Sequence, residues 1–143
     1  MNLIITKTLE FGSDIERVWR AITDPSEIAK WFSDSAEFDP RPGSLGWLEW
    51  EKHGRYPLRV ERVEPPHRIS WSWSHNAGFE FDQEKSTLVE WTLTERDQGG
   101  TLLELRESGF RTESAYKDNQ GGWDAELGEL LELLEGARAV PQE

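Results

Sequence analysis

The stretch from residue 121 to residue 136 constrains the fold of this chain more than any other. Its large apolar residues recur at i, i+4, i+7, i+8 and i+11, the spacing of one face of an α-helix. Trp123 begins this apolar stripe, and acidic residues fill much of the remaining surface. Such a stripe needs an apolar partner, and the tryptophan-rich alternating segments between residues 45 and 108 are the only upstream candidate of sufficient size. We therefore predict a sheet that packs along one long helix.

The chain before the sheet predicts one strand and two short helices. Residues 3–11 alternate, which indicates a strand with one buried face. Ser13 followed by Glu16 matches a capping box and predicts a helix over 14–22. Asp24 and Pro25 then predict the start of a second short helix.

The rest of the chain predicts antiparallel strands joined by proline and glycine turns. In the strand over 68–75, Ile69, Trp71 and Trp73 share one side, which we expect to face the long helix. We expect the serines between them to face water. The long helix is predicted to start near Thr112. It either continues through Gly121–Gly122, with a kink or a close approach to the sheet, or divides there into two helices. The other expected strands cover residues 36–39, 47–52, 55–63, 86–96 and 101–108.

Composition limits the class of protein and its partners. The 143 residues fit one domain, expected over 1–136, with a frayed tail over 137–143. No apolar run reaches bilayer length and no leader-like segment begins the chain, so we expect a cytoplasmic protein with no membrane span. The formal net charge of −12 argues against nucleic acid as a partner, and the absence of cysteine excludes disulfides and thiolate chemistry.

Candidate catalytic and metal-binding residues are few. His53 lies in an expected turn and His67 follows a proline pair, so we expect both to be solvated. His75 continues the inward face of the tryptophan strand. A histidine at such a position more often makes a structural hydrogen bond than acts as a general base. The histidines are too dispersed for a zinc site, and no phosphate loop or glycine-rich fingerprint occurs. We predict no catalytic residue, no metal and no cofactor.

Several short motifs, in order along nearly the whole chain, carry a family resemblance. They are VWRAITDP at 18–25, AKWF at 29–32, DPRPG at 39–43, VEPPHRI at 63–69, SGF at 108–110 and GW at 122–123. Each is common alone, but the ordered set resembles the START-related, birch-pollen-allergen-like superfamily (SRPBCC). The branch that it resembles is similar to the carboxy-terminal domain of the activator of heat shock protein 90 ATPase. One departure is Ser44–Leu45–Gly46, where that family usually has a second glycine and a basic residue.

The resemblance implies an α+β helix-grip fold, in which a curved antiparallel sheet, two short helices and a long carboxy-terminal helix enclose a cavity. It implies no fixed chemistry, because members bind lipids or steroids, catalyse reactions or regulate chaperones. We expect a monomer or weak dimer that binds a small apolar or aromatic molecule without catalysis. The alternatives are a regulator of heat shock protein 90 that acts by surface contact, and an enzyme of the cyclase or hydratase type with His75 or a pocket glutamate as base.

The aromatic inward faces supply the candidate ligand contacts. An empty apolar hollow of roughly 300 Å³ would cost on the order of 7 kcal/mol, so ligand, water or the tryptophans themselves must occupy such a space. Plain core packing of the tryptophans therefore stays open beside a ligand-lining role. The candidate ligand-binding residues are Trp31, Phe32, Trp50, Tyr56, Trp71, Trp73, His75, Phe79, Phe81, Trp91, Trp123 and Leu127.

Overall fold

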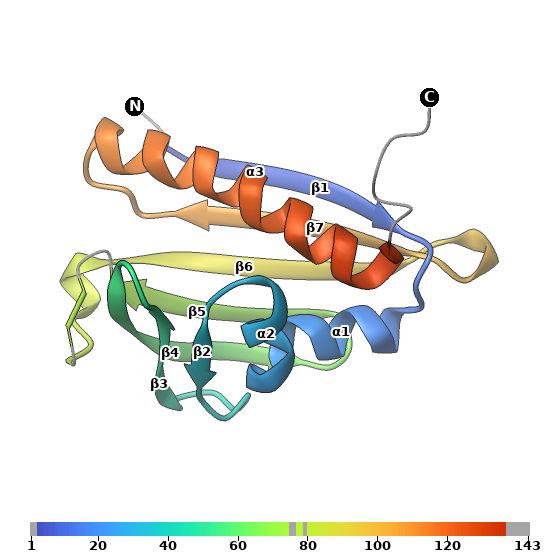
Figure 1. Cartoon of the computed structure of the whole chain (residues 1–143), viewed down its shortest axis with the longest axis horizontal. Coiled ribbons are helices and arrows are strands. Elements are labelled where there is room, and N and C mark those ends of the chain that lie inside the picture. Colours follow the sequence, from blue (N-terminus) through green and yellow to red (C-terminus); the bar gives the residue numbers. More distant parts are fainter. Residues whose placement is uncertain (1–2, 75–76, 79, 137–143) are drawn as a thin grey trace.

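A curved sheet of seven antiparallel strands holds the long helix against its concave face (Figure 1). The computed structural model describes residues 3–74, 77–78 and 80–136. The strands are β1 (Ile5–Phe11), β2 (Ser35–Glu37), β3 (Leu45–Trp50), β4 (Gly54–Glu64), β5 (Arg68–Ser74), β6 (Ser86–Glu95) and β7 (Thr101–Ser108). The helices are α1 (Ile15–Thr23), α2 (Pro25–Trp31) and α3 (Glu113–Glu135), with short 3-10 turns at Gln83–Lys85 and Asp97–Gly99.

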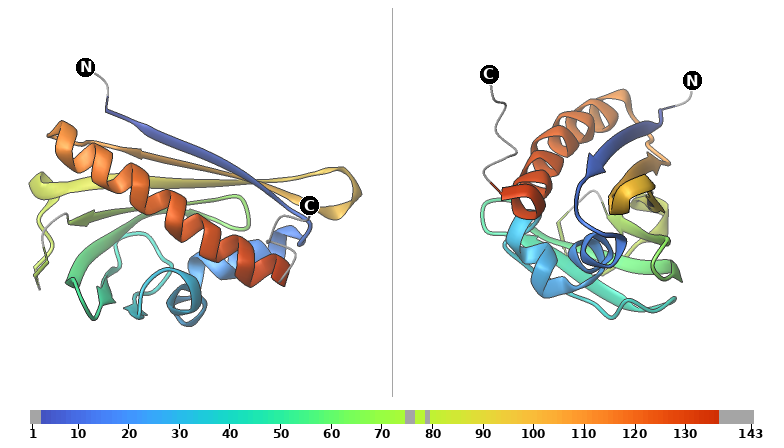
Figure 2. Two further views of the ribbon diagram at one scale, coloured as in Figure 1. Left: turned by 45° about the horizontal axis from the view of Figure 1, so that its top comes forward. Right: turned by 90° about the vertical axis from the view of Figure 1, so that its right-hand side faces the viewer.

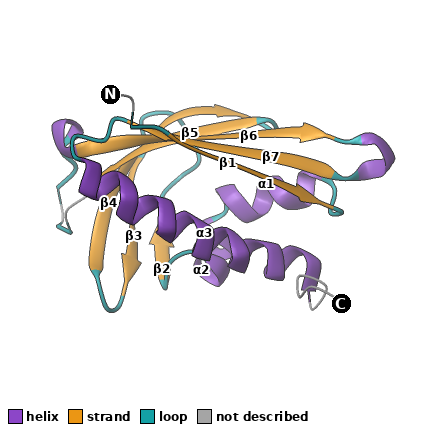
Figure 3. Cartoon of the chain, turned by 90° about the horizontal axis from the view of Figure 1, so that it is seen from above, coloured by secondary structure: helices purple, strands orange, loops and turns teal. Residues whose placement is uncertain are grey.

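The strand order is β1-β7-β6-β5-β4-β3-β2. Strands β2 to β7 follow one another as antiparallel neighbours, and β1 closes the order by pairing with the last strand, with Ile5 opposite Glu107. A register shift between Val60 and Arg62 interrupts the β4–β5 ladder, as a bulge does where a sheet bends. All three helices lie on one side of the sheet (Figures 2 and 3). The expected α+β helix-grip arrangement is confirmed.

Helix α3 is a single helix that passes through Gly121 and Gly122 without interruption. The side chain of Thr112 caps its amino terminus by accepting a hydrogen bond from the amide of Ala115 at 3.1 Å. Trp123, Leu127 and Leu130 of this helix are buried, as the apolar stripe predicts. The alternative of two helices meeting at the glycine pair is wrong.

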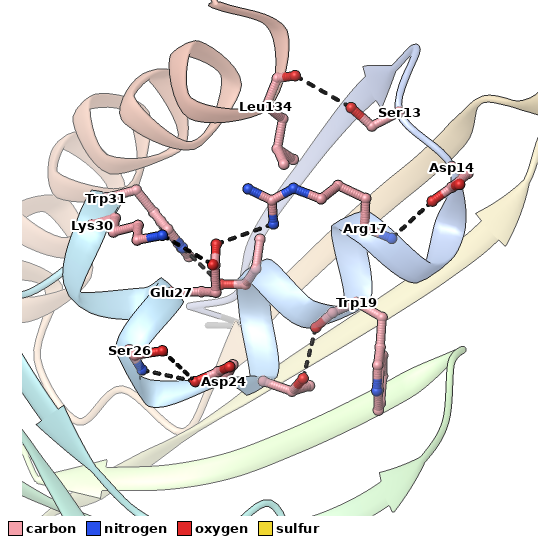
Figure 4. Close-up of polar contacts among 12 residues, drawn as sticks. Ser13, Asp14, Arg17, Trp19, Asp24, Ser26, Glu27, Lys30, Trp31 and Leu134 are labelled. Carbon is pink, nitrogen blue, oxygen red and sulfur yellow. Dashed lines mark hydrogen bonds and ion pairs between the residues drawn. The ribbon is translucent and has the colours of Figure 1, made fainter.

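The capping residue of α1 differs from the sequence prediction. Asp14, and not Ser13, accepts the capping hydrogen bond from the amide of Arg17, at 2.9 Å. The hydroxyl of Ser13 instead donates toward the end of α3, to Glu135 at 3.0 Å and to the carbonyl of Leu134 at 3.3 Å. Figure 4 shows the contact with Leu134. Ser13 therefore joins the start of the helical segment to the end of the last helix.

An ion-pair cluster fixes the corner between α1 and α2. Asp24 caps α2, as predicted, and Pro25 follows it in the first turn. Glu27 accepts from Arg17 of α1 and from Lys30 of its own helix, each at 3.1 Å (Figure 4). Burial opposes ionisation of Glu27, but these two cations outweigh that effect and hold its pKa below the ordinary value. The second short helix is thereby attached to the first by charge as well as by packing.

The serine face of β5 is buried, contrary to expectation. Ser70, Ser72 and Ser74 are each less than a tenth exposed. On the convex side of the sheet, Ser72 and Ser70 are paired with Arg59 and Arg62 of neighbouring β4, whose side chains are long enough to extend past a serine. Ser74 lies at the end of β5 and borders the cavity described below. Ser72 donates to Glu61 at 2.8 Å, and Arg59 pairs with the same carboxylate.

Candidate ligand-binding pocket

A cavity of about 510 Å³ opens between α3, the end of β5 and the β3–β4 hairpin. Helix α2 contributes Phe32, the residue that caps its carboxy end, to the lining. The lining residues are Phe32, Trp50, His53, Tyr56, Trp73, Ser74, Asp118, Asn119, Gly122, Trp123 and Glu126. Aromatic rings supply the apolar part of this surface, and the polar groups come from α3, from the β3–β4 hairpin and from Ser74 at the end of β5.

Phe32 is the ring around which the aromatic wall is arranged. It stacks on Trp123 with centroids 5.2 Å apart and an angle of 13° between the ring planes. It meets Trp50 edge to face at 5.2 Å and Trp73 at 5.7 Å. Tyr56 extends the wall by contacting Trp50 at 5.6 Å. These separations are those of favourable aromatic pairs, so the carboxy end of α2 is tied at the pocket to β3, β4, β5 and α3.

A buried carboxylate lies behind this wall. Glu107 of β7 is fully buried and accepts hydrogen bonds from the indole N–H of Trp73 at 2.8 Å and of Trp123 at 2.7 Å. The hydroxyl of Thr87 and the amide of Asn119 also donate to it. An indole N–H only donates, so each carboxyl oxygen acts as an acceptor for one pocket tryptophan. Glu107 thus sets the orientation of two rings that line the cavity.

Sequence reasoning missed Glu107, although the sequence contains a signal for it. In β7, Thr101, Leu103 and Leu105 alternate on the buried face, and Glu107 is the next residue of the same parity. A carboxylate on an otherwise apolar strand face must find several donors, because an uncompensated buried charge is costly. That combination of position and charge was sufficient to indicate a polar site beneath the helix.

The α3 side of the pocket is acidic. Burial, together with the nearby negative charges of Glu129 and Asp34, raises the pKa of the Glu126 carboxyl to about 7. Asp118, which precedes Glu126 in α3, is exposed at the rim of the pocket. His53 is exposed, as expected, and still borders the cavity from the hairpin turn. Within the described residues, no cluster of histidine, aspartate and glutamate is arranged to hold a metal ion.

The structure brings together only part of the predicted ligand-binding set. Phe32, Trp50, Tyr56, Trp73 and Trp123 line the cavity. Their role in binding stays a prediction.

Other members of the predicted set lie elsewhere. Phe81 lies under the guanidinium of Arg59, 4.9 Å from the ring centre, and Arg59 borders the convex side of the sheet. His75 and Phe79 lie outside the described residues. Four residues are buried in the core and are not among those that line the cavity: Trp31, Trp71, Trp91 and Leu127.

The long helix is amphipathic rather than uniformly apolar. No helix in the described part of the chain has the length and apolar character needed to cross a membrane.

Comparison with solved structures finds the same fold in several bacterial proteins. Protein MLL2253 from Mesorhizobium loti is 27% identical, with a TM-score of 0.81 over 94% of this chain and 98% of that chain. CalU16 from Micromonospora echinospora is also 27% identical, with a TM-score of 0.73 over 94% of this chain and 77% of its own. Aha1 from Colwellia psychrerythraea, described as a dimer, is 16% identical, with a TM-score of 0.78 over 94% and 98% of the two chains. At that identity the last match shows the fold alone.

Sequence comparison with curated proteins finds no match. The family model described as "Activator of Hsp90 ATPase homolog 1-like protein" matches residues 13–135, which run from the serine before α1 to the last residue of α3. This match covers the two short helices, most of the sheet and the pocket residues. The chain belongs to the Activator of Hsp90 ATPase homolog 1-like family.

Proposed function

We propose that this protein binds a small hydrophobic or aromatic molecule in the pocket beneath α3. The observation that carries the proposal is the aromatic wall around Phe32, which borders a cavity of about 510 Å³. Ligand pockets in proteins commonly measure about 300–1,000 Å³ and combine apolar walls with a few polar groups. The lining residues have this composition.

The division of labour among the tryptophans supports the same proposal. Trp71 and Trp91 are fully buried and pack against each other at 5.9 Å, so they fill the deep part of the interior. Trp50 and Trp73 are only partly buried and border the cavity. Large apolar rings left partly accessible in a concave surface are the usual contacts for an apolar ligand.

Gly122 provides a direct test because it lines the pocket and a Cβ there would meet nothing within 4 Å. In Gly122→Leu, the new side chain is expected to occupy the cavity while the helix gains about 1 kcal/mol of propensity. The neutral dye N-phenylnaphthylamine should bind the unaltered protein saturably, with enhanced fluorescence. The Gly122→Leu variant should lose at least tenfold in affinity and unfold at a higher temperature.

Gly128→Leu is the matched control. Gly128 lies in the same helix with the same open space around its Cβ, but it does not line the pocket. This variant should keep the dye affinity of the unaltered protein. Absence of saturable binding by the unaltered protein, or equal loss of binding in both variants, would contradict the proposal.

Family membership favours a second candidate, a regulator of heat shock protein 90 that acts by surface contact. It predicts that the protein is retained by an immobilised heat shock protein 90 middle domain and changes the rate of ATP hydrolysis. Gly122→Leu should leave both effects intact, because the substitution changes the pocket and not the exterior. No retention and an unchanged ATPase rate would remove this candidate.

A further inference from the structure

The hydrogen-bond donors of the pocket's three tryptophans are already used by the protein itself. The indole N–H of Trp50 donates to the carbonyl of Phe32 at 2.9 Å. Those of Trp73 and Trp123 donate to Glu107 at 2.8 and 2.7 Å. The rings therefore offer a ligand aromatic surface and no N–H group.

Two further lining donors are also occupied. The hydroxyl of Tyr56 donates to the carbonyl of His53 at 3.3 Å, and the side-chain amide of Asn119 donates to Glu107 at 3.2 Å. The hydroxyl of Ser74 and the ring of His53 are what remains on the donor side of the described lining. An anionic ligand would find neither a strong donor set nor a lysine or arginine among these residues.

The acceptor side of the pocket is different. Asp118 and Glu126 project from the same face of α3, at positions separated by eight residues, and both border the cavity. Neither carboxyl group makes a hydrogen bond or ion pair with another described side chain or with the described backbone. A ligand that carries hydrogen-bond donors and a positive charge would pair with both carboxyl groups, while its apolar part would contact the aromatic wall.

We infer that the ligand of this pocket is an organic cation, a protonated amine carried on an aromatic or hydrophobic skeleton. The inference rests on the proposed function and specifies its ligand class. Aromatic faces attract a desolvated ammonium group by cation–π interaction, and carboxylates at the rim attract it by charge. The net charge of −12 adds a long-range attraction for cations.

The electrostatics of Glu126 agree with this geometry. Burial and the charges of Glu129 and Asp34 make its ionised form unfavourable and bring its pKa to about 7. The other titratable groups that line the pocket are Asp118 on the same helix and His53 and Tyr56 on the opposite hairpin. A bound ammonium group would offset the repulsion among these carboxylates.

The test compares three probes that share one ring system and differ in charge: naphthylmethylamine, naphthylmethanol and naphthylacetate. Each is titrated into isotope-labelled protein at about pH 8, where Glu126 is mostly ionised, and the indole N–H resonances are followed. The ammonium probe should bind about tenfold more tightly than the alcohol, and the acetate more weakly than either. Equal affinities, or tightest binding of the acetate, would overturn the cation inference and leave the proposed function standing. Absence of a saturable shift with every probe would overturn both.

Two variants locate the charge. Asp118→Asn and Glu126→Gln keep the side-chain shape, and each should weaken the ammonium probe about threefold to tenfold while leaving the alcohol unchanged. Glu132→Gln is the matched control, an exposed carboxylate of the same helix outside the pocket, and it should change neither affinity. Unchanged ammonium affinity in both rim variants would contradict the inference.

Discussion

Glu107 is the residue on which the shape of the pocket depends most. A carboxylate removed from water is costly unless hydrogen bonds replace its hydration. Donors from β5, β6 and α3 do so, through Trp73, Thr87, Asn119 and Trp123. Removing this acceptor would leave the indole N–H groups of Trp73 and Trp123 without a hydrogen-bond partner. The loss of stability would therefore include the unsatisfied donors as well as the lost side chain of Glu107.

Substitution of Glu107 by glutamine tests this dependence. The amide keeps the size of the side chain, but its NH₂ group faces donors where a carboxyl oxygen had accepted. We expect a loss of about 2–3 kcal/mol in the free energy of unfolding. Glu104→Gln, on the exposed face of the same strand, should change stability by less than about 0.5 kcal/mol. Urea denaturation followed by circular dichroism measures both, and equal small effects would show that the buried hydrogen bonds contribute little.

Glu126 predicts an unusual dependence of stability on pH. Its pKa in the folded protein is about 7, above the ordinary value of 4.5, so the folded state binds more protons than the unfolded state between these pH values. Stability contributed by this group is therefore present below about pH 4.5 and is lost as the pH rises through about 7. The carboxylates of Glu129 and Asp34 act in this direction, while His53 is the one basic group of the described rim.

The glutamine of the Glu126→Gln variant cannot ionise, so the variant should not lose this stability as the pH rises. At about pH 8 we expect the variant to be more stable than the unaltered protein by roughly 1 kcal/mol, after allowance for solvent screening of a partly exposed group. Near pH 4.5 the difference should vanish. Thermal unfolding across this range provides the measurement, and a difference independent of pH would show that Glu126 titrates normally.

At the scale of elements, sequence periodicity predicted the helices and strands well, because local spacing determines them. The stripe of α3 and the alternation of β6 both identify the buried side correctly, whereas both faces of β5 are buried. The cap of α1 was misassigned because Ser13 and Asp14 both have suitable chemistry for it. Only the position of Glu135, which is 122 residues away from Ser13, decides between them.

Two single substitutions separate these roles. Asp14→Ala should cost about 1 kcal/mol, the usual value for a helix cap, and should speed hydrogen exchange in the first turn of α1. Ser13→Ala should speed exchange in the last turn of α3 instead, because it removes the contacts to Leu134 and Glu135. Faster exchange in α1 alone with both variants would restore Ser13 to the capping role.

The candidate pocket was less predictable than the elements around it. Alternation places Trp71, Trp73 and Trp91 on the inward face equally, yet only Trp73 borders open space. The difference depends on where α3 crosses the sheet, which no local pattern encodes. Asp118 and Gly122 belong to the pocket for the same reason, and both resemble ordinary solvent-facing residues in the sequence.

At the scale of the whole molecule, the charge excess opposes folding. Ion pairs such as Lys7–Asp124 and Arg106–Glu90 are partly or largely exposed and contribute little individually. The net charge of −12 leaves many carboxylates that repel one another in the folded state. Screening by salt should therefore stabilise the protein.

Raising sodium chloride from about 20 to about 300 mM should increase the melting temperature by about 2–4 °C. Potassium chloride at the same ionic strength should act equally, because the effect is one of screening and not of specific ion binding. Scanning calorimetry at about pH 8 tests this, where the carboxylates are ionised. A lower melting temperature in salt would show that the ion pairs outweigh the net repulsion.

The attachment of Trp73 and Trp123 to a single carboxylate also bears on how the pocket selects its occupant. Neither indole can turn without giving up its contact with Glu107, so the two planes are held in place before any guest arrives. A pocket with such fixed walls binds molecules whose shape already fits it, and it binds poorly those that would require the rings to move. Its selectivity then comes from rigidity, and a ligand that fits the pocket causes little loss of conformational entropy in the protein when it binds.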